Sequence, residues 1–283
     1  MAETVLHVSG LHRRYGSVRA VDDVSFSLAR GGSLGIVGES GSGKTTTARI
    51  VVGLEAPDEG HIRIRGDERT GRVRGRAARL ARAREIQMVF QDPFLSLDPR
   101  VSVEAALRET LRLHFPGADH ARRIAELLDQ VGLGSRAREA LPRQLSGGQR
   151  QRVAIARALA VEPAILVLDE AVAALDVSVQ AQILNLLADI RAETGVGYLF
   201  ITHDLGVVRC VTDDVIVMRQ GRIVEAGATE RVLASPQHPY TRLLLESVPR
   251  PGWDPHAIAA ARRALHHAPA GPDRTNGQST VLN

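Results

Sequence analysis

Several residue types and patterns are scarce in this chain of 283 residues, and each scarcity excludes a class of protein. The single cysteine, Cys210, excludes a disulfide within the chain and any metal or iron–sulfur centre held by several of its cysteines. Aromatic residues make up only 3%, which argues against a surface that stacks on nucleic-acid bases. No apolar run approaches the roughly 20 residues of a membrane-spanning helix. The first residues also lack a signal-peptide pattern, so we expect a cytoplasmic protein.

The composition otherwise suits a soluble α/β protein, with 44% apolar and 24% charged residues. The length allows one large domain or two small ones. A net charge of +4 is compatible with an anionic partner, and many of the arginines fall between Arg69 and Arg84. They point all round a helical wheel, so a solvated surface is expected there. Contact with anionic lipid head groups is the alternative, at about 1 kcal/mol per basic residue.

The stretch from Gly38 to Thr45 fits the phosphate-binding pattern G-x-x-x-x-G-K-[S/T] at every specified position. An apolar run suited to a buried strand precedes it, and a helical pattern that ends at Gly53 follows. Glycines let successive N–H groups point at one anion, Lys44 can reach the outer phosphates, and the Thr45 hydroxyl can bind Mg²⁺. The sequence therefore predicts a nucleotide site. Its residues are Gly38, Glu39, Ser40, Gly41, Ser42, Gly43, Lys44, Thr45 and Thr46.

The rest of the chain alternates between strand and helix patterns. Strands are expected over residues 4–8, 24–28, 34–37, 61–66, 85–90, 164–170, 197–202, 215–218 and 222–225. Helices are expected over 121–131, from Ser146 to 160, over 176–193 and from 229. Residues 11–16 look like an exposed segment between the first two strands. The strand at 61–66 is expected to pair with the first β region.

Four polar residues follow expected strands: Gln91, Asp169, Glu170 and His203. Because ligands of open parallel sheets bind outside the carboxyl ends of the strands, we expect these side chains beside the phosphate loop. Asp169 has the position of a carboxylate that holds Mg²⁺, and Glu170 can accept a proton from an attacking water.

Over roughly residues 4–249 the sequence resembles the ATP-binding subunit of an ABC transporter. The resemblance rests on the phosphate loop, Gln91, the signature Leu145-Ser146-Gly147-Gly148-Gln149, Asp169-Glu170, Ala174-Leu175-Asp176 and His203, in the family's order. It implies a RecA-like parallel-sheet core with an antiparallel β subdomain and an α-helical subdomain inserted at about 93–149. The ABC domain would span 1–249. Residues 250–283 have little patterning and are expected to form a mobile tail.

The resemblance also implies roles for the site residues. Tyr15 matches the aromatic that stacks on adenine, although a plain strand-edge tyrosine fits the sequence equally well. Gln91, Thr45 and Asp169 would lie at Mg²⁺, with Gln91 also contacting the water. Glu170 would be the general base, and His203 would contact the γ-phosphate.

The signature residues would act on the other subunit. Ser146, Gly147, Gly148 and Gln149 would bind the γ-phosphate of ATP held by that subunit, and Asp176 would lie in a loop at the dimer interface. Ser146 and Gln149 have capping-box spacing, so a helix N-terminus suited to an anion should begin there. ATP would therefore be sandwiched between two such domains, arranged head to tail.

Three stretches narrow the resemblance to the ATPases of oligopeptide/dipeptide and nickel importers. They are Gln91–Arg100, Leu175–Gln180 and Ser235–Thr241 with Val248-Pro249 after it. The chain departs from the family at Asp98, which is usually Asn, and at Ala171-Val172-Ala173, which is usually Pro-Thr-Ser. Some members carry a C-terminal cysteine cluster for an Fe–S centre, which one cysteine cannot provide.

The sequence thus predicts an ATP-hydrolysing subunit, with ATP and Mg²⁺ as cofactors, that drives uptake of di- and oligopeptides. Its expected partners are a second ABC ATPase subunit, identical or homologous, separate transmembrane permease subunits and, indirectly, a solute-binding protein. We expect it on the cytoplasmic face of the membrane, with no nucleic acid. Alternatives are an importer ATPase for nickel or another small solute, and an accessory ATPase of a soluble complex such as carbon–phosphorus lyase. A mechanical ATPase acting on DNA or ribosomes usually needs coiled coils, zinc inserts or a second domain.

Overall fold

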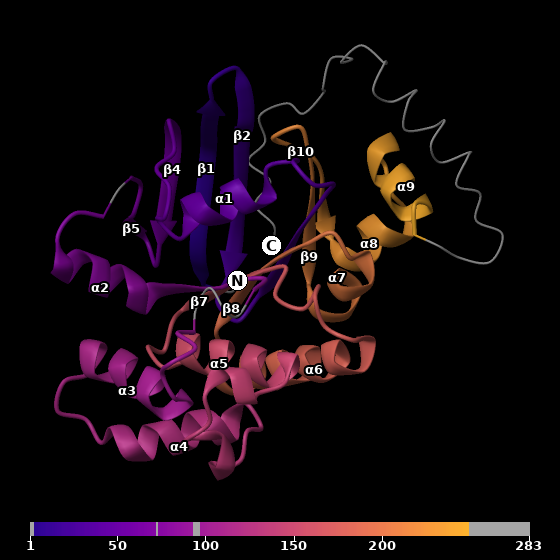
Figure 1. Cartoon of the computed structure of the whole chain (residues 1–283). Helices are drawn as coiled ribbons and strands as arrows, with labels where there is room; N and C mark the ends of the chain where they lie inside the picture. Colours follow the sequence, from indigo (N-terminus) through magenta and orange to yellow (C-terminus); the bar gives the residue numbers. More distant parts are fainter. Residues whose placement is uncertain (1–2, 72, 93–96, 249–283) are drawn as a thin grey trace.

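The molecule is built on two β-sheets with most of its helices packed on the larger one (Figure 1). The computed structural model describes residues 3–71, 73–92 and 97–248. Within these residues the larger sheet has six strands in the order β10-β9-β3-β8-β7-β6, and the smaller has four in the order β2-β1-β4-β5. The α/β architecture with a parallel core and an antiparallel β unit is confirmed.

The larger sheet is parallel except for β10, which returns antiparallel to β9. Its strands are β3 (Ser33–Val37), β6 (Ile86–Val89), β7 (Ile165–Asp169), β8 (Gly197–Thr202), β9 (Asp214–Arg219) and β10 (Arg222–Ala228). Every residue of β3, β7 and β8 is buried, as expected for strands covered on both faces. Alternate residues of β7 enter two different cores. Leu166 and Leu168 pack against helices, whereas Ile165 and Val167 face the smaller sheet.

The smaller sheet consists of β1 (Thr4–Tyr15), β2 (Val18–Ala29), β4 (Glu59–Ile64) and β5 (Asp67–Glu68). The expected pairing of the 61–66 strand with the first strand is confirmed. The expectation of an exposed segment at 11–16 is wrong, because β1 continues to Tyr15 and Leu11 is fully buried. The register shifts around Gly10, whose φ is +57°, interrupt the alternation of apolar and polar residues. A β-bulge therefore hid the second half of the strand.

The helices follow the strands in chain order. They are α1 (Lys44–Val51), α2 (Arg76–Glu85), α3 (Val103–His114), α4 (His120–Gln130), α5 (Gly147–Leu159), α6 (Val177–Thr194), α7 (Leu205–Val211), α8 (Thr229–Ala234) and α9 (Pro239–Glu246). Helices α3 and α4 are inserted between β6 and β7, and with α5 they form the lower layer of Figure 1. The predicted start of a helix at Ser146 is confirmed, since this residue is the N-cap of α5. Helix α9 was not anticipated.

The arginine-rich segment is only partly the solvated surface that we expected. Arg82 is 5% exposed, and its guanidinium donates to the carbonyls of Val51 and Arg69, each at 2.8 Å. Burial lowers the pKa of Arg82 to about 10. Arg69 in turn makes two hydrogen bonds to Glu85, at 2.7 and 2.6 Å. These arginines hold α2 to the end of α1, a long-range role that a helical wheel does not show.

Among the residues described, no helix has both the length and the apolar content required to cross a membrane. The expected tail, 250–283, lies outside the described residues.

Candidate nucleotide site

The phosphate loop joins the end of β3 to the start of α1, at the carboxyl edge of the larger sheet. Two of its glycines are required by close packing. A Cβ on Gly43, whose φ is +104°, would lie 2.2 Å from the carbonyl oxygen of Ala20. A Cβ on Gly38 would lie 2.2 Å from the carbonyl oxygen of Met218. The loop is therefore closed in by the start of β2 and the end of β9.

Lys44 lies inside this loop and is 5% exposed. Its Nζ donates to the carbonyl oxygens of Gly38 and Glu39, each at 2.8 Å. Burial lowers the pKa of the Lys44 ammonium, while the carboxylates of Glu170 and Asp169 act in the opposite direction. A buried cation facing two carboxylates is suited to an anionic ligand that arrives with a divalent cation.

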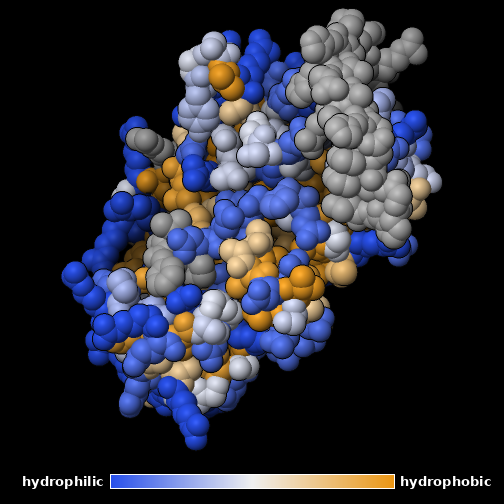
Figure 2. Space-filling model, turned by 45° about the vertical axis from the view of Figure 1, so that its right-hand side comes forward, coloured by the Kyte–Doolittle hydropathy of each residue, from blue (hydrophilic) through white to orange (hydrophobic). Residues whose placement is uncertain are grey.

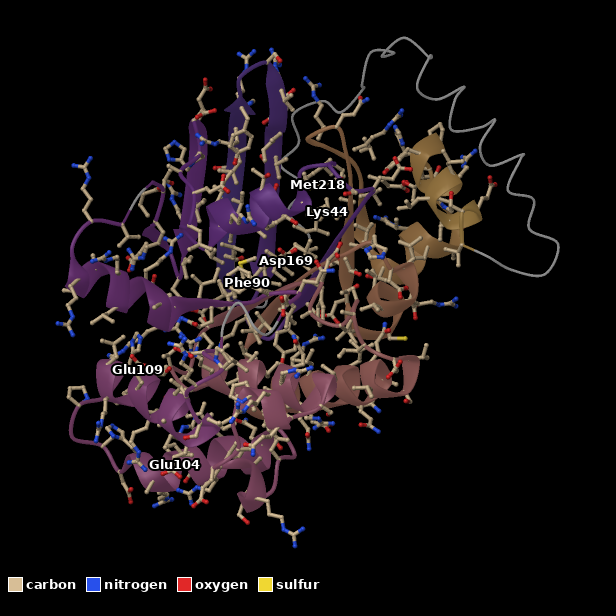
Figure 3. All side chains as sticks on the ribbon, in the orientation of Figure 1. Lys44, Phe90, Glu104, Glu109, Asp169 and Met218 are labelled. Atoms are coloured by element: carbon tan, nitrogen blue, oxygen red, sulfur yellow. The ribbon has the colours of Figure 1, made fainter. Side chains whose placement is uncertain are left out.

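Asp169 ends β7 beside the loop, and Figure 3 shows it close to Lys44. It is 8% exposed, and the hydroxyl of Thr45 lies 3.3 Å from its Oδ1. Burial raises the pKa of the Asp169 carboxyl, the Thr45 hydrogen bond opposes this, and the charge of Glu170 adds to it. A hydroxyl and a carboxylate so close together are hard oxygen donors of the kind that Mg²⁺ prefers.

Glu170 and His203 lie together at the ends of neighbouring strands. The register that pairs Asp169 with Ile201 sets them side by side, and Nδ1 of His203 is 3.1 Å from Oε1 of Glu170. Glu170 has a φ of +48°, a conformation that costs energy for a non-glycine residue and is often found at functional sites. The structure thus brings together the strand-end residues that the sequence singled out on β7 and β8.

The signature stretch begins α5. Oγ of Ser146 accepts from the N–H of Gln149 at 3.3 Å, and Oε1 of Gln149 accepts from the N–H of Ser146 at 2.9 Å. Gly148 packs against α6, where a Cβ would come 2.4 Å from Cγ1 of Val179. Both Ser146 and Gln149 are exposed, so this helix N-terminus is open to a partner.

The remaining predicted residues lie around these elements. Gln91 is exposed and follows β6. Asp176 is exposed at the N-cap of α6, next to Val177, which is 83% exposed. Tyr15 is 44% exposed, its hydroxyl donates to Glu55, and the guanidinium of Arg13 lies 4.9 Å from its ring centroid. The assignment of Tyr15 to adenine stays a prediction.

Sequence reasoning missed two features beside the site. Tyr240, on α9, contacts the phosphate loop; it lies in the Ser235–Thr241 stretch, to which the resemblance gave no role. A groove of about 460 Å³ follows Phe90 and separates β6 from α3, with Glu109 and Arg157 in its lining (Figure 3). Neither contact between distant segments leaves a local pattern in the sequence.

A glycine-rich loop between a parallel strand and a helix, with a buried lysine and strand-end carboxylates, defines a phosphate-loop nucleotide-binding protein. Residues 21–173 match the model of the ABC transporter family, and residues 224–272 match the C-terminal region of oligopeptide/dipeptide transporters. The first match covers more than half of the sequence. The chain therefore belongs to the ABC transporter family.

Individual relatives agree with this assignment. The oligopeptide transport ATP-binding protein OppD of Mycobacterium tuberculosis is 50% identical over 243 residues, which are 85% of this chain but only 39% of OppD. OppF of Bacillus subtilis is 41% identical over 261 residues, with 90% of this chain and 85% of OppF covered. The solved dimer of the ATP-binding cassette MJ0796, bound to ADP and Pi, is 30% identical with a TM-score of 0.69, over 79% of this chain and 98% of that one. The chain thus spans well under half the length of the OppD proteins that it matches.

Proposed function

We propose that this chain is the ATP-binding and ATP-hydrolysing subunit of an ABC importer for peptides. The observation that carries the proposal is the grouping of Asp169, Glu170 and His203 beside the loop of Lys44 and Thr45. The match of residues 21–173 to the ABC transporter model supports it.

Mg²⁺ would be held by Thr45 and Asp169, with Gln91 as the further residue that the resemblance implies. The described residues contain no cluster of three or more His, Cys, Asp or Glu side chains, which agrees with a cation that uses few protein ligands and the phosphates of its substrate. When bound, the cation would neutralise charge on the phosphates.

Hydrolysis would follow from the positions of the chain's own groups. Lys44 and the N–H groups of the loop would stabilise charge on the transferred phosphoryl group. Glu170 would accept the proton of the attacking water, and His203, in contact with Glu170, would orient that carboxylate and meet the γ-phosphate. The exposed N-terminus of α5 would supply Ser146 to the ATP of a second subunit.

The partner of the site would be a second cassette arranged head to tail. The solved MJ0796 cassette is described as a dimer, and this chain shares its fold. Figure 2 shows hydrophobic side chains gathered near the middle of one otherwise mostly hydrophilic face. The groove beside Phe90 would receive a permease subunit at the cytoplasmic face of the membrane, because it lies between the sheet and the inserted helices and next to Gln91.

Peptides are the proposed cargo of the whole transporter. The names of OppD and OppF and the match of residues 224–272 to the oligopeptide/dipeptide C-terminal region favour them over nickel or a soluble complex.

The proposal is tested by co-expressing the chain with the permease and binding-protein genes that accompany it. We expect the permeases to co-purify and peptide-loaded binding protein to stimulate ATP hydrolysis in liposomes. Lys44→Ala should abolish that stimulation, because the phosphates lose a buried cation. ATP turnover without any permease association would overturn the importer assignment while leaving the nucleotide site intact.

The unusual Ala171-Val172-Ala173 loop gives a second prediction. Ala171 and Val172 are buried at 6% and 5%, whereas Ala173 is exposed. Thr at position 172 would bury a hydroxyl, so Ala173→Ser alone is the informative change towards the usual family sequence. One added hydrogen bond at the interface should tighten the ATP-bound dimer by up to about tenfold. Sedimentation with ATP measures this, with the exposed Ala174→Ser as the control.

An inert wild type that gains turnover through Ala173→Ser would contradict this prediction, because the loop would then be a disabling change rather than a tuning one.

A further inference from the structure

Tyr240 reaches the phosphate loop from near the far end of the described chain. Its hydroxyl oxygen accepts a hydrogen bond from the backbone N–H of Glu39 at 3.0 Å. The side chain is 2% exposed, and the guanidinium of Arg219 lies 5.2 Å from its ring centroid. None of the roles assigned above uses this tyrosine.

Helix α9 holds Tyr240 in a defined place. The carboxylate of Glu225, on β10, accepts from the backbone N–H groups of Gln237 and His238 at 2.8 and 3.0 Å. His238 then caps the helix, because its Nδ1 accepts from the N–H of Tyr240 at 3.1 Å. The ring itself packs in the core with Val217 of β9. The hydroxyl is thus presented by a packed element and not by a loose surface side chain.

The contact fixes one particular residue of the loop on both sides. The N–H of Glu39 is held by Tyr240, and the carbonyl of Glu39 accepts from Lys44 at 2.8 Å. Farther along the loop, the carbonyl of Ser42 accepts from the N–H of Gly221, in the β9–β10 turn, at 3.0 Å. The C-terminal part of the chain therefore binds the phosphate loop at two points.

We propose that Tyr240 is a positioning residue of the nucleotide site, which holds the loop in its phosphate-binding form and couples nucleotide affinity to the seating of α9. The inference rests on the nucleotide binding proposed above. Since the hydroxyl acts on the loop in both the ground state and the transition state, its loss should weaken ATP binding and leave kcat nearly unchanged. Coupling is reciprocal, so bound ATP should also stabilise the seating of α9.

The test uses Tyr240→Phe in the full chain, which removes the hydroxyl and keeps the ring. Calorimetric titration with ATP and Mg²⁺ should show a Kd about 3- to 10-fold higher than that of the wild type, with KM raised in parallel, as expected for one lost hydrogen bond. Hydrogen exchange should show that ATP protects the amides of residues 239–246 in the wild type and much less in the variant.

Tyr198→Phe is the matched control. Tyr198 is also buried, at 1% exposure, and its hydroxyl donates to the carbonyl of Leu187 at 2.8 Å, in a different core. This control should lose thermal stability but keep the wild-type Kd.

Each result decides between the proposals. A Tyr240→Phe variant that binds ATP as the wild type does, or a Tyr198→Phe variant with the same rise in Kd, would overturn the positioning role. A wild type that binds ATP no better than Lys44→Ala would overturn the proposed function itself.

Discussion

Glu170→Gln is expected to bind ATP as the wild type does and to hydrolyse it about 10²- to 10⁴-fold more slowly, the usual contribution of a positioned base. The carboxylate follows the last residue of β7 and is held by His203 at 3.1 Å. An amide of the same shape keeps the contacts but cannot accept the proton of the attacking water. Because hydrolysis normally reopens the dimer, this variant should also accumulate as an ATP-bound dimer.

Single-turnover hydrolysis and sedimentation with ATP measure both effects. Glu104→Gln is a suitable control, since Glu104 is paired with Arg108 and Arg138 in the inserted helices (Figure 3). It should turn over ATP at the wild-type rate. Unchanged turnover in Glu170→Gln, together with a monomer at saturating ATP, would show that another group is the base.

The residues at the carboxyl ends of the strands were predictable because their positions follow from one local rule. Each strand of the core is an apolar run, and each run ends at a polar residue, so the parallel topology gathers Asp169, Glu170 and His203 without further information. The capping box of Ser146 and Gln149 is equally local, and the helix begins where the sequence predicts.

The features that were missed depend on contacts between distant segments. Tyr240 and Glu39 are 201 residues apart, and Arg82 and Val51 are 31 apart. Nothing in the sequence near either partner records such a pair, because one polar side chain and one backbone group are enough to make it. The bulge at Gly10 is a different case, since it breaks the alternation on which the strand pattern depends.

Ser146→Arg is the other change with a large expected effect, and its effect should appear in the opposite subunit. In the isolated chain the Ser146 side chain only caps α5, through the N–H of Gln149. An arginine there would place a bulky side chain where the γ-phosphate of the partner's ATP should meet the helix N-terminus. Turnover should therefore be abolished, while ATP binding to the chain's own loop stays nearly intact.

Loss of the cap itself has a matched control. Ser102 is the N-cap of α3, accepting from the N–H of Ala105 at 3.3 Å. Ser102→Arg removes an equivalent cap, at a cost of about 0.5–2 kcal/mol in stability, but leaves the signature unchanged. It should keep its turnover, and a loss equal to that of Ser146→Arg would mean that the defect is one of folding.

Mixing Ser146→Arg with Lys44→Ala tests the head-to-tail arrangement directly. Neither variant alone can form a complete site, because one lacks the signature and the other lacks the loop lysine. A mixed dimer, however, joins the intact loop of the first chain to the intact signature of the second. Random exchange should make half of the dimers mixed, so about a quarter of the wild-type sites should recover in a symmetric dimer. A mixture that exchanges subunits and still shows no ATP-dependent closure would contradict a head-to-tail dimer of this chain, since such a dimer must restore one of its two sites.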